Sequence, residues 1–244
     1  MKRLHTHSQH FLRSPATAQG LLRRSSIKKG STVYDLGAGS GVISSVLAKH
    51  ARKVIAVEVE PDTLEILKRN MAPYTNVAIL RKDILTLEFQ KEPYAIFANI
   101  PFSISSPLVA RLAELTNKPE VACLIVQKQF GYKLQSNTPG QFTNQLGMLV
   151  GTQYTVTVLK NLRKTDYWPH PAVDTVCIEL KKRRTPLIEP SRFAAYKKFT
   201  EDCFSDPKKL AVMPLHIIGI KPGASPSRLT LDQWLLLFRS QKRY

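Results

Sequence analysis

The sequence has few cysteines and no long apolar segment. Only three of its 244 residues are cysteines, and Cys123, Cys177 and Cys203 form no CxxC pair. This spacing argues against a disulfide framework or a zinc site, so we expect buried free thiols in a reducing cytoplasm. No apolar run approaches the roughly 20 residues of a membrane helix, and residues 1–11 lack the apolar core of a secretory signal. We therefore predict a cytoplasmic protein without a membrane partner.

Acidic residues are also scarce. The chain has 36 Lys and Arg against 18 Asp and Glu, a formal net charge of +18. No acid precedes Asp35, and a second acid-free stretch covers residues 121–165. Such an excess favours a polyanionic partner, because cations that neutralise phosphates release counterions; a generally basic, solvated surface would have the same composition. Since separate segments lack acids, we predict an RNA-binding surface assembled by the fold. Its expected contacts are Arg13, Lys128, Lys133, Arg163, Lys164, Lys181, Lys182, Arg183 and Arg184.

Strand-like and helix-like segments alternate in the first half of the chain. The expected strands are residues 32–36, 53–58, 77–80, 94–98 and 121–126, and the expected helices are residues 15–24, 42–50 and 61–71. Ser14 before Pro15 is typical of a capped helix start. Alternating strands and helices form βαβ units, so we predict an α/β fold with a mostly parallel, twisted sheet.

The pattern changes after residue 151. Two β-branched segments, residues 154–159 and 174–180, are joined by a connection that contains Pro169 and Pro171 and has no helical period. Strands joined without a helix are expected to be antiparallel, so the sheet should end in an antiparallel strand. The later part contains two amphipathic segments, residues 191–204 and 230–239. We predict a cofactor-binding catalytic domain over residues 1–181 and a small helical RNA-binding domain over residues 182–244.

A glycine-rich loop, Gly37-Ala38-Gly39-Ser40-Gly41, follows the first expected strand of this sheet. Glycines allow the backbone to approach a ligand closely, and the following helix presents free N–H groups. The loop alone has another interpretation, a tight strand-to-helix turn. Glu58 follows the next strand about twenty residues later, where a carboxylate can accept the hydroxyls of a ribose. Glu58 therefore indicates a nucleoside-bearing cofactor, either NAD or S-adenosylmethionine.

Two further features follow expected strands. Asp83-Ile84 can bind an adenine, through its carboxylate and an apolar contact with the ring, although Asp83 alone could simply cap a turn. Asn99-Ile100-Pro101-Phe102 suits the methylation of an adenine N6 amine, whose lone pair is delocalised into the ring. The Asn99 side chain and a carbonyl at Ile100 or Pro101 would accept the two amine hydrogens, and Phe102 would stack on a flipped base. A proline turn with a buried phenylalanine is the alternative interpretation.

Together these residues resemble the ribosomal RNA adenine N6-methyltransferases. The resemblance also includes three other segments: Ser8-Gln9-His10-Phe11-Leu12, Val126-Gln127-Lys128 and Tyr167-Trp168-Pro169-His170-Pro171-Ala172-Val173-Asp174. It implies a Rossmann-like class I methyltransferase fold, the cofactor S-adenosylmethionine and a ribosomal RNA substrate. The implied cofactor site is His10, Leu12, Gly37, Ala38, Gly39, Glu58, Val59, Asp83, Ile84 and Asn99. The implied catalytic residues are Asn99, Ile100, Pro101 and Phe102.

Two branches of the family differ in substrate. Erm enzymes methylate an adenine of the large-subunit (23S) RNA and give macrolide, lincosamide and streptogramin B resistance, whereas KsgA-type enzymes dimethylate adenines of the small-subunit (16S) RNA. Ile100 and the ending from Thr230 to Phe238 resemble the Erm branch. His10 stands where Asn is usual, and a neutral imidazole can donate one hydrogen bond there. Phe102 stands where Tyr is common, so a stacking face remains without a hydroxyl contact.

Two other functions compete with this assignment. A non-catalytic RNA-binding or transcription-factor-like relative would lose the cofactor residues, which are intact here. A DNA adenine methyltransferase can share the Asn99 motif, but the segment from Ser8 to Leu12 and the basic tail favour RNA. His5, His7 and His10 lie close together without a nearby carboxylate or thiol, so we expect no metal. We also expect a monomer without an obligatory protein partner.

Overall fold

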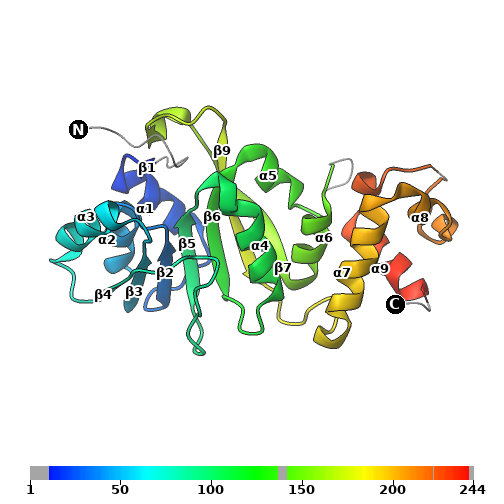
Figure 1. The fold of residues 1–244 in the computed structure, drawn as a ribbon, viewed down its shortest axis with the longest axis horizontal. Helices are drawn as coiled ribbons and strands as arrows, with labels where there is room; N and C mark the ends of the chain where they lie inside the picture. The colour runs from blue at the N-terminus through cyan, green and yellow to red at the C-terminus, as the bar shows by residue number, and fades with distance from the viewer. Residues whose placement is uncertain (1–10, 137–141, 222, 242–244) are drawn as a thin grey trace. The chain divides into compact units, whose positions relative to one another are not determined.

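The computed structural model describes residues 11–136, 142–221 and 223–241 (Figure 1). These residues form two compact units, which we call the sheet unit and the helical unit. The sheet unit contains the described residues up to Gly131 and residues 157–182, whereas the helical unit contains residues 132–156 and those from Arg183 onward. The sheet therefore ends at Lys182, close to the expected boundary, but residues 132–156 group with the helical unit. The assignment of one function to each part of the chain stays a prediction.

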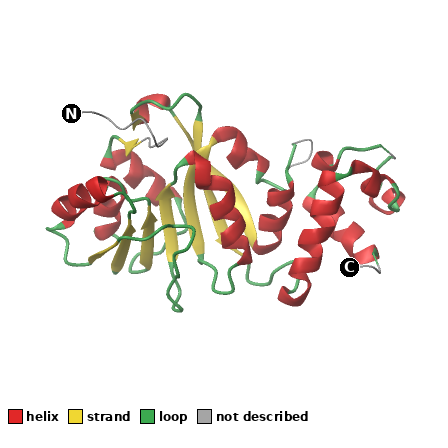
Figure 2. Ribbon diagram, in the orientation of Figure 1, coloured by secondary structure: helices red, strands yellow, loops and turns green. Residues whose placement is uncertain are grey.

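The sheet unit is built on a seven-stranded sheet with the strand order β4-β3-β2-β5-β6-β9-β7 (Figure 2). Neighbouring strands from β4 to β6 are parallel, and β9 is antiparallel to β6. This mixed sheet confirms the expected α/β fold with an antiparallel strand after the parallel ones. The bounds are β2 Thr32–Leu36, β3 Lys53–Val57, β4 Val77–Leu80, β5 Ala95–Asn99, β6 Val121–Gln127, β7 Tyr154–Leu162 and β9 Thr175–Lys182.

The central strands are mostly apolar and almost completely buried, because helices cover both faces of a parallel sheet. All five residues of β2 are buried, and so are the first six of β6. One core cluster joins these strands to α1 and α2 through side chains that include Leu21, Leu22, Leu47 and Val54. The helices of this unit are α1 Pro15–Arg24, α2 Val42–Ala48, α3 Pro61–Met71 and α4 Ser105–Glu114, and α5 Lys128–Lys133 starts in it.

The starts of α1 and α3 agree with the sequence patterns that predict them. The Ser14 hydroxyl caps α1 by accepting a hydrogen bond from the backbone N–H of Ala16 at 3.1 Å, and Pro15 is the first helical residue. Pro61 likewise begins α3, whose buried face is Leu64, Leu67 and Met71. Pro suits this position because the first helical N–H has no partner within the helix. The helix expected over residues 42–50 is shorter, since α2 ends at Ala48.

The helical unit encloses its own aromatic core. Trp234 packs edge-on against Phe199, with ring centroids 5.7 Å apart, and Met148 and Leu149 of α6 belong to the same cluster. These contacts explain why residues 132–156 group with this unit. The Thr230 hydroxyl and Gln233 side chain form a capping box at the start of α9. The elements are α6 Gln145–Gln153, α7 Pro190–Ser205, α8 Pro207–Ala211, α9 Leu231–Ser240 and the 3-10 turns η3 Leu215–Ile218 and η4 Pro226–Arg228.

A second, two-stranded sheet joins distant parts of the sheet unit. β1 (Phe11–Leu12) pairs antiparallel with β8 (Tyr167–Trp168), and a 3-10 turn, η2 (Lys164–Asp166), precedes β8. In Figure 1 the yellow-green segment before β9 lies beside β1. The backbone N–H of Arg13 extends this pairing by donating to the carbonyl oxygen of Asp166 at 2.9 Å. The beginning of the described chain is thereby fixed beside the segment that leads into β9.

The three cysteines are buried free thiols, as the sequence predicts. Burial raises the pKa of Cys177 to about 12, so this thiol stays protonated at neutral pH. Among the helices of residues 11–136, 142–221 and 223–241, none is long and apolar enough to cross a membrane.

Candidate cofactor and target-base site

Four predicted site segments meet at one edge of the sheet. β4, β3, β2 and β5 are adjacent and parallel, so their carboxyl ends face the same way (Figure 1). Gly37 follows β2, Glu58 follows β3, Asp83 lies three residues after β4, and Asn99 ends β5. The carboxyl edge of an open α/β sheet is where ligands bind. The topology therefore brings together four segments that the sequence separates by up to 62 residues, from 37 to 99.

The glycine loop is held by the end of β3. The backbone N–H groups of Gly37 and Ala38 both donate to the carbonyl oxygen of Val57, each at 2.9 Å. Gly37, Gly39 and Gly41 have φ angles of +73°, +58° and +90°. Residues with a Cβ rarely adopt such angles, so the loop needs glycine at these positions. The structure shows the tight strand-to-helix turn, and ligand binding by the same loop stays a prediction.

Glu58 is a buried carboxylate that fixes the loop. Its Oε2 accepts the backbone N–H of Gly39 at 2.9 Å, and its Oε1 accepts those of Val59 and Glu60 at 2.9 and 3.1 Å. Its side chain is only 4% exposed. A carboxylate has roughly four acceptor positions, and these three bonds leave one of them, on Oε2, for a ligand hydroxyl.

Residues from two other strand ends, those of β4 and β5, converge on Gly37. A Cβ at Gly37 would lie 3.6 Å from Ile84 Cδ1, 3.8 Å from Pro101 Cδ and 4.0 Å from the Asn99 carbonyl oxygen. These groups lie within van der Waals range of the position where a side chain is missing, so both strand ends pack closely against the Gly37 backbone. Ile84 and Ile100 are buried, while Asn99, Pro101 and Phe102 are partly buried. The structure thus places the loop, the adenine-contact segment and the Asn99 motif around one point.

A narrow cleft of about 20 Å³ marks this point. It is lined by Leu12, Gly37, Ala38, Ser40, Val42, Ile43 and Asn99. Leu12, Gly37, Ala38 and Asn99 are predicted site residues and Ser40 belongs to the predicted glycine loop, whereas no sequence pattern indicates Val42 or Ile43. Their position follows from the start of α2, which runs directly from the glycine loop.

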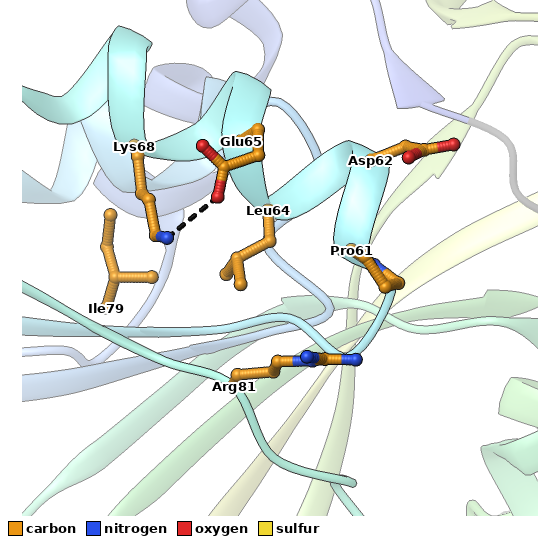
Figure 3. A pocket seen from close by; sticks show the side chains of 7 residues that line it. All are labelled: Pro61, Asp62, Leu64, Glu65, Lys68, Ile79 and Arg81. Carbon is orange, nitrogen blue, oxygen red and sulfur yellow. Dashed lines mark hydrogen bonds and ion pairs between the residues drawn. The ribbon is translucent and has the colours of Figure 1, made fainter.

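A larger pocket, of about 420 Å³, lies between α3 and the edge strand β4 (Figure 3). Leu64 and Ile79 give it an apolar wall, and Glu65 and Lys68 form an ion pair of 2.8 Å at its side. None of the predicted site residues lines it. We assign the chemistry to the smaller cleft, because only there do the glycine loop and the amine-orienting Asn99 meet.

Asp83 is exposed and closes a turn. Its Oδ1 accepts the backbone N–H of Leu85 at 2.8 Å, and its carbonyl oxygen accepts that of Thr86 at 3.2 Å. Both of our interpretations of Asp83 therefore remain compatible with the structure. The cap fixes the carboxylate relative to Ile84, and the exposed side chain can present its second oxygen to an adenine amine.

The Asn99 turn separates the two candidate backbone acceptors. The carbonyl oxygen of Pro101 already accepts hydrogen bonds from the Ile104 N–H at 3.1 Å and the Ser105 hydroxyl at 3.4 Å. A carbonyl oxygen has two lone pairs, so the carbonyl of Ile100 is the better acceptor for a substrate amine. Phe102 begins the turn η1 (Phe102–Ile104), which continues into α4.

Asp35 is a site residue to which the sequence analysis assigned no role. It is fully buried at the end of β2, and its Oδ2 accepts the Ser44 hydroxyl at 2.6 Å. Among the described residues its Oδ1 has no hydrogen-bond partner. Burial raises the pKa of Asp35 to about 7, against the opposing effect of Ser44. A buried, unsatisfied carboxylate oxygen beside the glycine loop suits a cationic ligand, since a positive charge favours the ionised form.

Arg111 is a second residue near the site that the sequence patterns do not indicate. From α4, its Nη1 donates to the carbonyl oxygen of Ile84 at 3.2 Å, and its Nη2 donates to that of Leu87. Its guanidinium also lies over the Phe89 ring, 5.3 Å from the centroid. A single arginine on a helix carries no signal in the sequence, because its partners are backbone atoms of another segment.

The predicted RNA contacts differ in their surroundings. Lys182 forms an ion pair of 2.7 Å with Glu120, and Arg183 Nε donates to the carbonyl oxygen of Gly151 at 2.8 Å. Two of the four consecutive basic residues 181–184 thus have partners within the protein. Arg13, Lys133, Arg163, Lys164, Lys181, Lys182 and Arg184 are exposed, and Lys128 and Arg183 are partly buried. His10, a predicted cofactor contact, lies outside the described residues, as do His5 and His7.

The comparisons with known proteins agree with this geometry. A family model, ribosomal RNA adenine dimethylase, matches residues 2–211. The chain is 29% identical to the ribosomal RNA small subunit methyltransferase A of Thermotoga neapolitana, over 96% of this chain and 90% of that protein. It is 22% identical to an rRNA adenine N-6-methyltransferase of Bacillus licheniformis, over 97% and 86%. The crystal structure of the 23S rRNA methyltransferase ErmE superposes with a TM-score of 0.81 and 25% identity, over 94% of this chain and 98% of ErmE.

Proposed function

Because the chain belongs to the ribosomal RNA adenine dimethylase family, and is an S-adenosylmethionine-dependent rRNA adenine N6-methyltransferase, we propose that it modifies a specific adenine of the large-subunit RNA. The fold is the Rossmann-like fold of these enzymes.

The residues in and around the cleft fit S-adenosylmethionine. Gly37 brings bare backbone beside Ile84 and Asn99, and Glu58 Oε2 keeps one acceptor position for a ribose hydroxyl. In this proposal Asp83 accepts from the adenine amine, with Ile84 against the ring. Asp35 supplies a negative charge on the sheet side of the loop. The cofactor, when bound, supplies a methyl group activated on a sulfonium.

The target amine is oriented by the Asn99 turn. The Asn99 side-chain oxygen and the Ile100 carbonyl accept its two hydrogens, which draws the N–H bonds out of the ring plane and directs the lone pair at the methyl group. Phe102 provides a stacking face for the flipped base. No general base is needed, because the nitrogen becomes acidic only once it carries the methyl group. The protein thus contributes orientation, the effect that a poor nucleophile needs most.

The similarity to ErmE carries the proposal for large-subunit RNA. It extends over nearly the whole of both chains, so it includes the helical unit as well as the cleft. Ile100 and the ending from Thr230 to Phe238 support the same branch. On this proposal the protein acts in the cytoplasm as a monomer and makes a sensitive bacterium tolerant of macrolides, lincosamides and streptogramin B.

Small-subunit RNA is the second candidate substrate. It is favoured by the 29% identity to the Thermotoga neapolitana small-subunit enzyme, which is higher than the identity to ErmE. One experiment separates the two: transfer of tritiated methyl groups to separated, protein-free large- and small-subunit RNA, followed by mapping of the labelled base. Label in an adenine of the large-subunit RNA supports the proposal. Label confined to small-subunit RNA or small subunits contradicts it and supports the second candidate.

A further inference from the structure

Trp168 is a large aromatic side chain that the fold leaves in solvent. It is 51% exposed, whereas the only other tryptophan of the chain, Trp234, is fully buried. Neighbouring residues of a strand point to opposite sides, and Tyr167 takes the inward position, with its hydroxyl 2.7 Å from the Thr175 hydroxyl. The pairing with β1 thus holds the strand so that the indole of Trp168 faces outward.

The position of Trp168 is next to the candidate site. In the β1–β8 pair, Leu12 lies opposite Tyr167 and Phe11 lies opposite Trp168. Leu12 lines the cleft that also contains Asn99. Paired strand residues are roughly 5 Å apart at Cα, so the backbone of Trp168 lies one residue pair away from Leu12, which lines the cleft. An RNA strand that delivers its adenine to Asn99 has neighbouring nucleotides within reach of this surface.

The surroundings of the indole are basic and held by hydrogen bonds. The His170 ring packs edge-on against the Trp168 ring, with centroids 5.8 Å apart, and His170 Nδ1 lies 2.8 Å from the Lys164 carbonyl oxygen. Lys164 Nζ donates to the Ala172 carbonyl oxygen at 2.8 Å. The Arg163 side chain is 83% exposed and reaches Asp166 at 3.7 Å. The segment therefore presents a stacking face beside cations, which matches a nucleotide with its base and phosphate.

We propose that the indole of Trp168 stacks on an unpaired RNA base that neighbours the target adenine, with Arg163 and Lys164 close to the adjoining phosphates. This inference rests on the proposed function and specifies how its RNA is held. Phe102 serves the target base, whereas Trp168 serves a flanking one. Stacking on aromatic side chains tolerates any base, because every base has a π face. Trp168 consequently adds affinity for an unpaired strand without reading its sequence.

Steady-state methylation separates this role from catalysis. With whichever rRNA the parent protein methylates, Trp168→Ala is expected to raise the KM for RNA by about tenfold, within the range for loss of one stacked base. The kcat and the affinity for S-adenosylmethionine stay at parent values, and Trp168→Phe recovers most of the loss because it keeps a ring. Val173→Ala, which truncates a 40% exposed apolar side chain of the same segment, is the matched control and leaves KM unchanged.

Fluorescence gives a second, direct measurement. Of the two tryptophans only Trp168 is exposed. Its fluorescence emission is therefore expected to be quenched when the same RNA is added. Trp168→Phe should abolish this quenching while RNA still binds. Suppose that the parent protein methylates rRNA. The stacking inference is then overturned if the Trp168→Ala variant has the parent KM, or if bound RNA leaves the tryptophan emission unchanged. Either result leaves the proposed function intact. A parent protein that methylates neither rRNA overturns the proposed function itself.

Discussion

Arg111 Nη1 donates a hydrogen bond to the carbonyl oxygen of Ile84 at 3.2 Å, and this bond connects the two halves of the site. Arg111 lies on α4, which continues from the turn that carries Asn99 and Phe102. Ile84 belongs to the segment predicted to contact the cofactor adenine. The segment between β4 and β5 has no regular structure beyond its turns, so a side chain from a helix fixes it in place.

Arg111→Ala is expected to weaken S-adenosylmethionine binding by about tenfold, because two carbonyl oxygens lose a charged donor and the 84–87 segment is released. Arg111→Lys should recover part of this loss, since it keeps one charged donor. Calorimetry with the cofactor measures both. Arg69→Ala, which truncates an exposed arginine of α3, is the control. Parent affinity in the alanine variant would show that the segment holds its position without Arg111.

Glu58→Ala should weaken S-adenosylmethionine binding by about 1.5–3 kcal/mol, the scale of hydrogen bonds to a charged group. It should also lower the free energy of unfolding, because three backbone N–H groups lose their acceptor. Calorimetry and chemical denaturation of the same variant separate the two effects. An unchanged cofactor affinity would mean that the ribose is bound elsewhere.

The buried Asp35 predicts a pH dependence of stability. Its pKa rises from 3.8 to about 7 on folding, mainly by burial, so the folded protein binds more protons than the unfolded chain between these values. Stability therefore falls as pH increases through this window. Asp35→Asn lacks this titration. The difference in free energy of unfolding between the variant and the parent should therefore shift in favour of the variant from pH 5 to pH 8, by up to a few kcal/mol at about 1.4 kcal/mol per pKa unit. Denaturation of both cofactor-free proteins across that range measures the difference, and parallel profiles would rule out Asp35 as its source.

Phe102→Ala should slow methyl transfer by roughly ten- to a hundredfold, as expected for loss of one stacked base at about 1–3 kcal/mol. Phe102→Tyr keeps the ring and most of the rate. Asn99→Ala should be slower than both, because it removes an acceptor of the reacting amine. Single-turnover methylation and cofactor binding are measured on the same variants. A Phe102→Ala variant with the parent rate would contradict stacking at this residue, as would an equal loss of cofactor binding in both Phe102 variants.

Binding to RNA should fall steeply with salt, with a log–log slope of magnitude about 3 or more if several phosphates are contacted. Lys182 and Arg183 have partners within the protein, whereas Lys181 and Arg184 are exposed. Neutralising Lys181 and Arg184 together should therefore flatten the slope more than neutralising Lys182 and Arg183. Filter binding over a salt series tests this. Equal slopes in both double variants and the parent would show that residues 181–184 have no role in RNA binding.

The arrangement of the site edge could be predicted because it depends on local patterns. Each βα unit repeats the same direction, so the residues after β2, β3, β4 and β5 must meet at one edge. The helix α6 and its place in the helical unit could not be predicted in this way. Six of the eight residues 145–152 are apolar or glycine, with Gln145 and Thr152 as the polar ends, and such a buried segment has no amphipathic period. Its core partners, such as Trp234, come about 85 residues later, and nothing local encodes that contact.

Arg111 and Asp35 show a second limit of sequence patterns. The partners of Arg111 are carbonyl oxygens, which every residue possesses, and the protonation of Asp35 depends on burial by a complete fold. The exposure of Trp168 is likewise not evident from sequence patterns, because the pairing with β1 decides that its neighbour Tyr167 is the buried residue. Side-chain identity alone predicts which chemistry is available, while orientation depends on contacts made across the fold.

The pairing of β1 with β8 has a consequence for how the protein is made on the ribosome. Synthesis proceeds from the N-terminus, and Leu12, a wall of the cleft, receives its strand partner only when Tyr167 has been added. The glycine loop and all four ligand-bearing strand ends emerge before that point. A nascent chain can therefore assemble β2 to β6 and still lack one wall of its cleft, so the capacity to hold a cofactor arises late in translation.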